Sequence, residues 1–310
     1  MTSALCTLSR KTLVAGMTRC HMTSHRPVSL WKLIWRQSFQ KMDLKAYFKR
    51  VNMADPGPPS LSALRELHRH HVLSVPTENL DIHSGEKIIL EKSLIYKKIV
   101  ERKRGGFCYE SNGLFLWVLE ELGYKPKVLS GSVWNKIYGV YGPKFDHLIM
   151  MVELEGKKWL CDVGFGEGII DPIPLEDGWE EEQENGVFRL RVERETWYLE
   201  RKDGDLWRSL FKFTLEEWKF EDFKEMCEYH QISPSSLFTC KSLCSLHLLG
   251  GRLTYMGHRL ITTQFTRGGG CVKTTRDLSE DEIPDVLRDR FGIVLKGKLI
   301  PKDEGIKPPN

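Results

Sequence analysis

One cysteine in this chain stands where a thiol can be made reactive. Cys108 follows Arg104–Phe107 (Arg-Gly-Gly-Phe) and opens an apolar pattern of helical spacing that ends at Gly123. The pattern predicts that Cys108 lies in the first turn of a helix, where unpaired N–H groups and the positive dipole end favour a thiolate. Arg104 is expected to add positive charge nearby. The competing interpretation is a buried, inert cysteine, the commonest fate of a free thiol.

A histidine and an aspartate lie on two neighbouring segments that we predict to be strands. These segments, His147–Leu154 and Lys157–Val163, are joined at Glu155-Gly156, a two-residue turn typical of a β-hairpin. With that turn, His147 and Asp162 share one face as diagonal neighbours, about 5–7 Å apart. An imidazole and a carboxylate so placed form a base and its orienting partner. The alternative is a structural hydrogen bond at a strand end.

Cysteine, histidine and aspartate therefore occur in the chain order Cys108, His147, Asp162. A nucleophile, a base and an orienting acid are the general requirement for covalent acyl chemistry. Pairing with histidine lowers a thiol pKa, so a thiolate is available at neutral pH. Chain order alone is weak evidence, because any chain of this length contains the three residue types in some order.

Composition limits the classes of protein that these residues could serve. Of the 310 residues, 41% are hydrophobic and 28% charged, an ordinary globular balance. Residues 1–42 hold seven basic and no acidic residues, and without those seven charges the net +4 becomes −3, which indicates no nucleic-acid partner. No apolar run approaches the ~20 residues of a membrane span. Eight scattered cysteines suit a reducing compartment.

Residues 1–41 form a basic extension, rich in Ser and Thr, that we exclude from fold reasoning. Its composition resembles a mitochondrial presequence. The alternative, which we favour, is translated upstream sequence without function, because a regular globular pattern begins at Met42. We accordingly expect a cytoplasmic protein, with mitochondrial import as the alternative.

The remaining pattern changes from helical to strand-like after Gly123. Helices are expected near residues 43–51, 60–71 and 90–103 before the cysteine, and near 214–230 and after 279 in the last third; strands dominate 127–213 and 243–265. His68, His70 and His71 invite a metal site, but no cysteine or carboxylate completes a ligand set nearby. We therefore predict a solvated helix end there and no metal.

Five separated motifs occur in order between residue 42 and about residue 301. They are Val75-Pro76-Thr77-Glu78-Asn79-Leu80, Arg104-Gly105-Gly106-Phe107-Cys108, Phe145-Asp146-His147-Leu148, Asp162-Val163-Gly164-Phe165-Gly166 and Ser233-Pro234-Ser235-Ser236-Leu237-Phe238. Together they resemble the arylamine N-acetyltransferase family. The resemblance implies a multi-domain α+β fold around a cysteine-protease-like triad: a helical bundle (42–123), a central β-barrel (124–213), and a C-terminal α/β lid with a tail (214–310).

The resemblance also implies a xenobiotic-metabolising acyltransferase with a ping-pong mechanism. Acetyl would pass from acetyl-coenzyme A, a co-substrate and not a bound cofactor, to arylamines, arylhydrazines or heterocyclic amines. Cys108 would carry the acetyl as a thioester, His147 would be its base, and Asp162 would orient His147. We expect a monomer with no nucleic-acid or membrane partner.

Further positions match substrate contacts of the family. Asp146, His147 and Phe165 match residues around the acceptor, and Tyr229 and Ser235 match contacts to coenzyme A. Two departures stand out: Lys144 follows a proline where mammalian relatives have small polar residues, and the segment before residue 213 lacks their insertion. Lys144 could meet a phosphate of coenzyme A.

Position 167 is Glu, close to Phe165. We hypothesise that the Glu167 carboxylate repels anionic acceptors such as aminobenzoates.

Two other functions remain open on the residues alone. A cysteine hydrolase, such as a thioesterase or a transglutaminase-like protease, would use the same triad with water or a peptide as acceptor. A non-catalytic role, as a ligand-binding protein or redox-sensing thiol, would need no turnover. The intact triad motifs argue against the latter.

Overall fold

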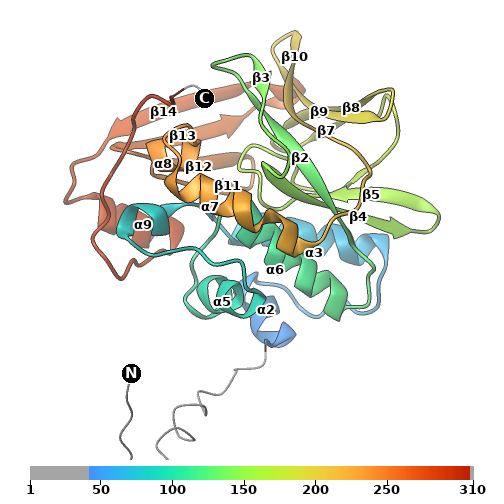
Figure 1. Ribbon diagram of the computed structural model, residues 1–310, viewed down its shortest axis with the longest axis horizontal. Coiled ribbons are helices and arrows are strands. Elements are labelled where there is room, and N and C mark those ends of the chain that lie inside the picture. The colour runs from blue at the N-terminus through green and yellow to red at the C-terminus, as the bar shows by residue number, and fades with distance from the viewer. Residues whose placement is uncertain (1–41, 308–310) are drawn as a thin grey trace, which may run out of the picture. The chain divides into compact units, whose positions relative to one another are not determined.

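The computed structural model describes residues 42–307, so the basic extension at 1–41 lies outside the described residues. Helices and strands are both extensive, which confirms the α+β class (Figure 1). Within residues 42–307, no helix combines the length and apolarity needed to cross a membrane. The helical segments are α2 (Leu44–Arg50), α3 (Leu61–Ser74), α4 (Leu80–Ser84), α5 (Lys92–Tyr96), the π-helical turn η1 (Lys97–Glu101), α6 (Cys108–Glu121), the 3₁₀ turn η2 (Phe220–Phe223), α7 (Lys224–Ile232), α8 (Leu237–Cys240), the 3₁₀ turn η3 (Arg267–Gly269) and α9 (Ile283–Phe291).

The strands form two antiparallel sheets. They are β1 (Thr77–Glu78), β2 (Lys127–Asn135), β3 (Val140–Tyr141), β4 (His147–Leu154), β5 (Lys157–Cys161), β6 (Ile173–Pro174), β7 (Glu180–Gln183), β8 (Gly186–Glu193), β9 (Thr196–Asp203), β10 (Leu206–Phe213), β11 (Leu243–Leu248), β12 (Gly251–Met256), β13 (Arg259–Phe265) and β14 (Cys271–Asp277).

The larger sheet is curled. Its order is β6-β5-β4-β2-β10-β9-β8-β7, with β3 added against β2. Ile173 of β6 and Leu190 of β8 come from opposite ends of this order yet belong to one buried cluster, as expected when a sheet bends around its own core. The end strands β6 and β7 are not paired with each other in the described part of the chain. The β-barrel that the resemblance implied is therefore an open, curled sheet.

The smaller sheet, β1-β11-β12-β13-β14, joins residues 77–78 to strands of the last quarter of the chain. Its edge strand β1 comes from the Val75–Leu80 motif. Thr77 pairs with Ser245, and Glu78 with Cys244, both on β11. Helix α9 packs on this sheet, and its Leu287 and Phe291 share a buried cluster with the sheet residues.

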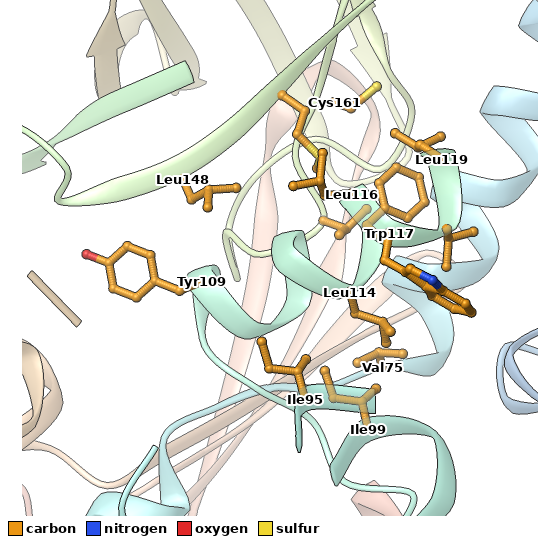
Figure 2. Packing of buried hydrophobic residues seen from close by; sticks show 14 of the residues in the cluster. Val75, Ile95, Ile99, Tyr109, Leu114, Leu116, Trp117, Leu119, Leu148 and Cys161 are labelled. Atoms are coloured by element: carbon orange, nitrogen blue, oxygen red, sulfur yellow. The ribbon is translucent and has the colours of Figure 1, made fainter. Parts of the chain in front are cut away.

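Helix α6 lies at the centre of the fold. Every residue from Cys108 to Leu119 is buried, which is the property of a core helix and not of an amphipathic surface helix. It contacts α5 on one side and β4 on the other. Figure 2 shows Leu114, Leu116 and Leu119 of this helix together with Ile95 of α5 and Leu148 of β4, all members of one buried cluster. The helix predicted from Cys108 to Gly123 is confirmed, with Gly123 just past its end at a φ of +88°.

The buried side chains do not follow the predicted domain boundaries closely. One cluster combines residues of α3 and α6 with Leu148 and Met150 of β4 and with Cys227 of α7. A second fills the curled sheet, and a third lies between the smaller sheet and α9. The division at 42–123, 124–213 and 214–310 stays a prediction.

A buried network of five charged side chains holds the start of α6. Arg104 binds Glu78 through Nε–Oε1 at 2.9 Å and Asp81 through Nη2–Oδ1 at 2.6 Å, and Lys98 Nζ lies 2.7 Å from Asp81 and 2.8 Å from Glu110. Burial raises the pKa of Glu110 to about 7, against the opposing charge of Lys98. The expectation that Arg104 supplies positive charge to Cys108 is wrong, because two carboxylates neutralise its guanidinium.

Removing Arg104 should leave the buried Glu78 carboxylate without its cation and Asp81 with Lys98 in place of two cations. We expect Arg104→Met to lower the free energy of unfolding by about 3–5 kcal/mol, measured by urea denaturation. Arg102→Met is the matched control, because Arg102 pairs with Glu86 in a partly exposed bridge at 3.3 Å and should change stability by less than about 1 kcal/mol. Equal losses in the two variants would contradict the assignment.

Candidate active site

The two glycines before Cys108 let two motifs touch through their backbones. A Cβ at Gly105 would lie 2.0 Å from the carbonyl oxygen of Pro76, so no other residue fits without a shift. The Gly106 N–H donates to that carbonyl at 3.2 Å, and the Gly106 carbonyl accepts from the Glu78 N–H at 3.0 Å. The Arg-Gly-Gly-Phe-Cys motif is thereby fixed against β1, with Cys108 as the first residue of α6.

The predicted hairpin register is confirmed. Leu154 faces Lys157, and Met150 faces Cys161. One residue beyond β5, the Asp162 Oδ2 lies 2.7 Å from His147 Nε2, and both side chains are almost fully buried. The acid and the imidazole that the sequence placed on one face therefore form a direct pair. If His147 Nε2–H donates to Asp162, the other ring nitrogen, Nδ1, is free to act as a base.

Three groups besides His147 fix Asp162. Its Oδ1 accepts from Asn112 Nδ2 at 2.9 Å and from the Gly164 N–H at 3.0 Å. Its backbone N–H lies 3.1 Å from His68 Nε2, while His68 Nδ1 lies 2.6 Å from the Ile170 carbonyl. This arrangement fits a neutral His68 that donates from Nδ1 and accepts at Nε2, and burial lowers its pKa accordingly.

Asp162 stays ionised in this setting. Burial alone would raise its pKa, but the His147 charge, the His147 hydrogen bond and the donors Asn112 and Gly164 outweigh burial and lower the pKa below its usual value. A carboxylate with this many donors can orient His147 and stabilise its protonated form.

The turn after Asp162 lies directly on the first turn of α6. A Cβ at Gly164 would be 2.8 Å from Cys108 Cα and 3.0 Å from the Cys108 carbonyl oxygen. The backbone of Leu148, next to His147, hydrogen-bonds the Cys108 thiol. The three predicted residues are thus gathered at the N-terminus of α6, from α6, β4 and the turn after β5.

The electrostatics of Cys108 differ from the expectation. Burial raises the pKa of the thiol well above its usual value, the carboxylates of Asp146 and Asp162 add to this, and the Leu148 hydrogen bond opposes it. The helix terminus does not by itself yield a thiolate exposed to solvent. A thiolate can form on Cys108 only if the thiol proton passes to a nearby base, because transfer to water is disfavoured by the raised pKa.

Two aromatic rings flank the His147 imidazole. The ring centroid of Phe165 lies 5.2 Å from that of His147, and Phe211 of β10 lies 5.1 Å from it. The two phenyl rings are 5.5 Å apart and nearly edge to face. Phe165 is partly exposed and presents an apolar surface beside the His147 ring, while its place near the acceptor stays a prediction.

Asp146 is engaged within the protein. Its Oδ2 accepts from the Val133 N–H at 3.0 Å, and its Oδ1 lies 3.1 Å from His230 Nε2 on α7. His230 Nδ1 lies 2.9 Å from the hydroxyl of Ser236, the N-cap of α8. His230 therefore connects the residue beside His147 to the turn that carries Ser235.

The predicted coenzyme contacts lie around this turn. Tyr229 is half-buried, with its ring centroid 5.5 Å from that of His230. The Ser235 N–H donates to Ser233 Oγ at 3.2 Å. Lys144 lies over the Trp218 ring, with Nζ 3.6 Å from the centroid.

Glu167 is not an isolated negative charge. Its carboxylate binds Arg208 Nη2 at 2.7 Å and lies 3.2 Å from Arg252 Nη2. Although burial opposes it, these cations lower the pKa of Glu167 to about 2. The hypothesis that Glu167 repels anionic acceptors has lost its physical basis, because two guanidinium groups compensate the charge.

Sequence reasoning missed four residues of the site: His68, Asn112, Phe211 and His230. His68 was assigned to a solvated helix end, which is wrong, because His68 and His71 have no exposed surface. The sequence does indicate their burial, because His68 and His71 each stand four residues after Leu64 and Leu67, on the same apolar face of α3. Asn112 stands four residues after Cys108, on the same helix face. Nothing local marks Phe211 or His230.

Comparison with known proteins identifies this chain as an acyltransferase. A family model described as N-acetyltransferase matches residues 60–300. The chain belongs to the arylamine N-acetyltransferase family, as its motifs predicted.

The similarity to individual relatives spans nearly their whole length. The chain is 36% identical over 282 residues to arylamine N-acetyltransferase 2 of Rattus norvegicus, covering 84% of this chain and 97% of the rat protein. It resembles the solved arylamine N-acetyltransferase of Salmonella typhimurium with a TM-score of 0.74 and 30% identity, covering 83% of this chain and 92% of the other. The structure of the Mycobacterium marinum enzyme in complex with CoA gives a TM-score of 0.73 and 30% identity, with 81% and 93% covered.

A methyl group at Gly164 should disturb the contact between the Asp162 turn and α6. We expect Gly164→Ala to lower the free energy of unfolding by about 1–3 kcal/mol, because the new Cβ meets the Cys108 backbone. It should also slow alkylation of Cys108 by iodoacetamide, followed by peptide mass mapping. Gly305→Ala is the control, since its Cβ meets nothing within 4 Å. Unchanged alkylation and stability in Gly164→Ala would contradict this.

Asn112 is a positioning residue, and its loss should affect the acid–base pair more than the overall fold. We expect Asn112→Ala to slow acyl transfer by about 10–100-fold and to shift its pH profile, because Asp162 loses one of its donors. Asn135→Ala removes a turn-capping asparagine far from the pair and serves as control. A slower reaction with an unchanged pH profile would reduce Asn112 to a purely structural role.

Proposed function

We propose that this chain transfers an acetyl group from acetyl-coenzyme A to an aromatic amine or hydrazine through a thioester on Cys108. The observation that carries the proposal is the paired His147 and Asp162 held against the first turn of α6, where Cys108 begins the helix. The relatives indicate the donor and acceptor classes, because they are arylamine N-acetyltransferases and one of their structures is a complex with CoA.

In the first half-reaction, the Cys108 proton passes to His147 Nδ1 as the sulfur attacks the thioester carbonyl of acetyl-coenzyme A. The bond from the acetyl carbon to the coenzyme sulfur breaks, and the departing thiolate takes the proton from His147. Burial disfavours a net change of charge in the site. Transfer of the proton from Cys108 to His147 causes none, because thiolate, imidazolium and the Asp162 carboxylate carry the same total charge as before.

In the second half-reaction, the amine nitrogen attacks the acetyl carbon on Cys108. His147 accepts a proton from the amine, the carbon–sulfur bond to Cys108 breaks, and the thiolate is reprotonated from His147. N–H groups at the start of α6 lie where negative charge develops on sulfur. Asp162, with its lowered pKa, stabilises the imidazolium in both steps.

The two substrates would meet the site through different walls. Phe165 offers an apolar surface beside His147 for an aromatic acceptor. Tyr229 and Ser235 are the proposed contacts to coenzyme A, near the His230 link to Asp146. We further propose a cytoplasmic, monomeric enzyme without a permanently bound cofactor.

Acyl transfer itself is the decisive measurement. Protein mixed with acetyl-coenzyme A should gain a single acetyl group on Cys108 by mass spectrometry, and an aminofluorene should discharge it. We expect no adduct in Cys108→Ala and at least about 10³-fold slower acylation in His147→Gln. The exposed Cys271 provides the control, because Cys271→Ser should acylate like the wild type.

Each outcome assigns the function. An adduct that water clears as fast as the amine does would identify a cysteine hydrolase instead. No adduct at all would leave a binding or redox role for the same fold.

A further inference from the structure

A cavity lies between the curled sheet and the smaller sheet, and residues of both sheets line it. It is lined by residues of β9 and β10 of the curled sheet, by residues of β12, β13 and β14 of the smaller sheet, and by Glu167. Its volume is about 180 Å³. That exceeds the ~30 Å³ of one water and falls below the ~300 Å³ of a site for a whole drug-sized molecule. The size suits a small ion or one terminal group of a larger ligand.

The lining of this cavity is strongly cationic. Six basic side chains face two acidic ones, Glu167 and Asp203. The inner part holds three guanidinium groups, Arg201, Arg208 and Arg252, against the single carboxylate of Glu167. Besides burial, the charges of Arg252 and Arg208 lower the pKa of Arg201, while Glu167 opposes them, so the cations repel one another. The ion pairs of Glu167 with Arg208 and Arg252 do not neutralise all of the positive charge in the lining.

Buried donors in the lining have no partner in the protein. Arg252 is 7% exposed and Thr263 2% exposed. Within residues 42–307, Arg252 Nε, Arg208 Nε and Thr263 Oγ1 have no hydrogen-bond acceptor. A buried donor without an acceptor costs about 1–3 kcal/mol. Three such donors around one cavity fit a ligand that brings several acceptor atoms.

The cavity is linked to the proposed acceptor wall by a short stretch of backbone. Arg252 Nη1 donates to the Gly166 carbonyl at 2.9 Å, between Phe165 and Glu167. Phe165 contacts the His147 ring. A group held in the cavity therefore lies next to the segment that forms the wall beside the base.

We propose that this cavity binds an oxyanion group, such as a phosphate, sulfate or carboxylate, through Arg208, Arg252 and Thr263. Tetrahedral and carboxylate oxyanions supply several acceptors in a small volume, and guanidinium groups bind them with charge-assisted hydrogen bonds. Glu167 holds two of the arginines in place and leaves a net positive charge for the ligand.

Calorimetric titration with inorganic phosphate, at constant ionic strength set by chloride, tests the site directly. Wild-type protein should bind one phosphate saturably. Arg208→Gln should weaken binding about tenfold and the isosteric Thr263→Val about threefold. Arg276→Gln is the matched control, because this β14 arginine lies outside the lining and bonds Glu282. Thermal unfolding of each variant checks that the fold is intact. Thr263→Val should unfold like the wild type, because valine has nearly the same shape as threonine.

The outcomes separate cleanly. No saturable binding, or equal weakening in Arg276→Gln, or unchanged affinity in both cavity variants, would overturn the proposal. The inactive Cys108→Ala protein should bind phosphate like the wild type, so this test does not depend on the proposed function.

Inhibition kinetics then identify the source of the oxyanion. If phosphate competes with acetyl-coenzyme A, the cavity holds a coenzyme phosphate. If it competes with the amine, the cavity takes an acid group of the acceptor, and Arg208→Gln should slow acetylation of an aminobenzoate more than that of a neutral arylamine. Competition with neither supports a site for a free oxyanion.

Discussion

The start of α6 depends on a buried network of ion pairs among five side chains: Glu78, Asp81, Lys98, Arg104 and Glu110. Each of these groups would be costly to bury alone, and the geometry that satisfies them all joins β1, α4, η1 and α6 at one point. Cys108 begins α6 within this region, so its position is set by ion pairs in which it takes no part. The conformational freedom of the nucleophile is removed before any substrate arrives, which is the condition for efficient positioning of reacting groups.

The same burial that fixes the site also changes its chemistry. A solvent-exposed cysteine at a helix terminus would lose its proton to water, whereas Cys108 is enclosed among carboxylates and holds its proton. In the proposed mechanism, reactivity then depends on His147 and on the donors that keep Asp162 charged. A buried thiol with a raised pKa holds little thiolate, and the thiol form reacts more slowly with oxidants and unspecific electrophiles.

Features set by neighbouring residues in the chain were predictable, and features set by distant ones were not. The apolar spacing after Cys108 and the Glu155-Gly156 turn gave α6 and the His147–Asp162 pair, because helix and hairpin geometry are local. The pairing of Arg104 with Glu78 was not predictable from the sequence, because the two residues come together only when β1 pairs with Gly106. Likewise, Glu167 meets arginines from two different sheets. A local sequence pattern gives the charge of a residue, but it does not reveal which charged residue of another element will pair with it.

The two-residue strand β1 has a consequence for how the protein is made. Thr77 and Glu78 pair with Ser245 and Cys244, so residues beside the nucleophile complete a sheet whose other strands come from the last quarter of the chain. Contacts of such long sequence separation form late, since the intervening chain must be closed first. During synthesis, a nascent chain that already contains cysteine, histidine and aspartate still lacks the strands that anchor β1. On the proposed mechanism, catalytic competence therefore arrives with the C-terminal sheet, and a prematurely terminated product would carry the three proposed catalytic residues without the sheet that anchors β1.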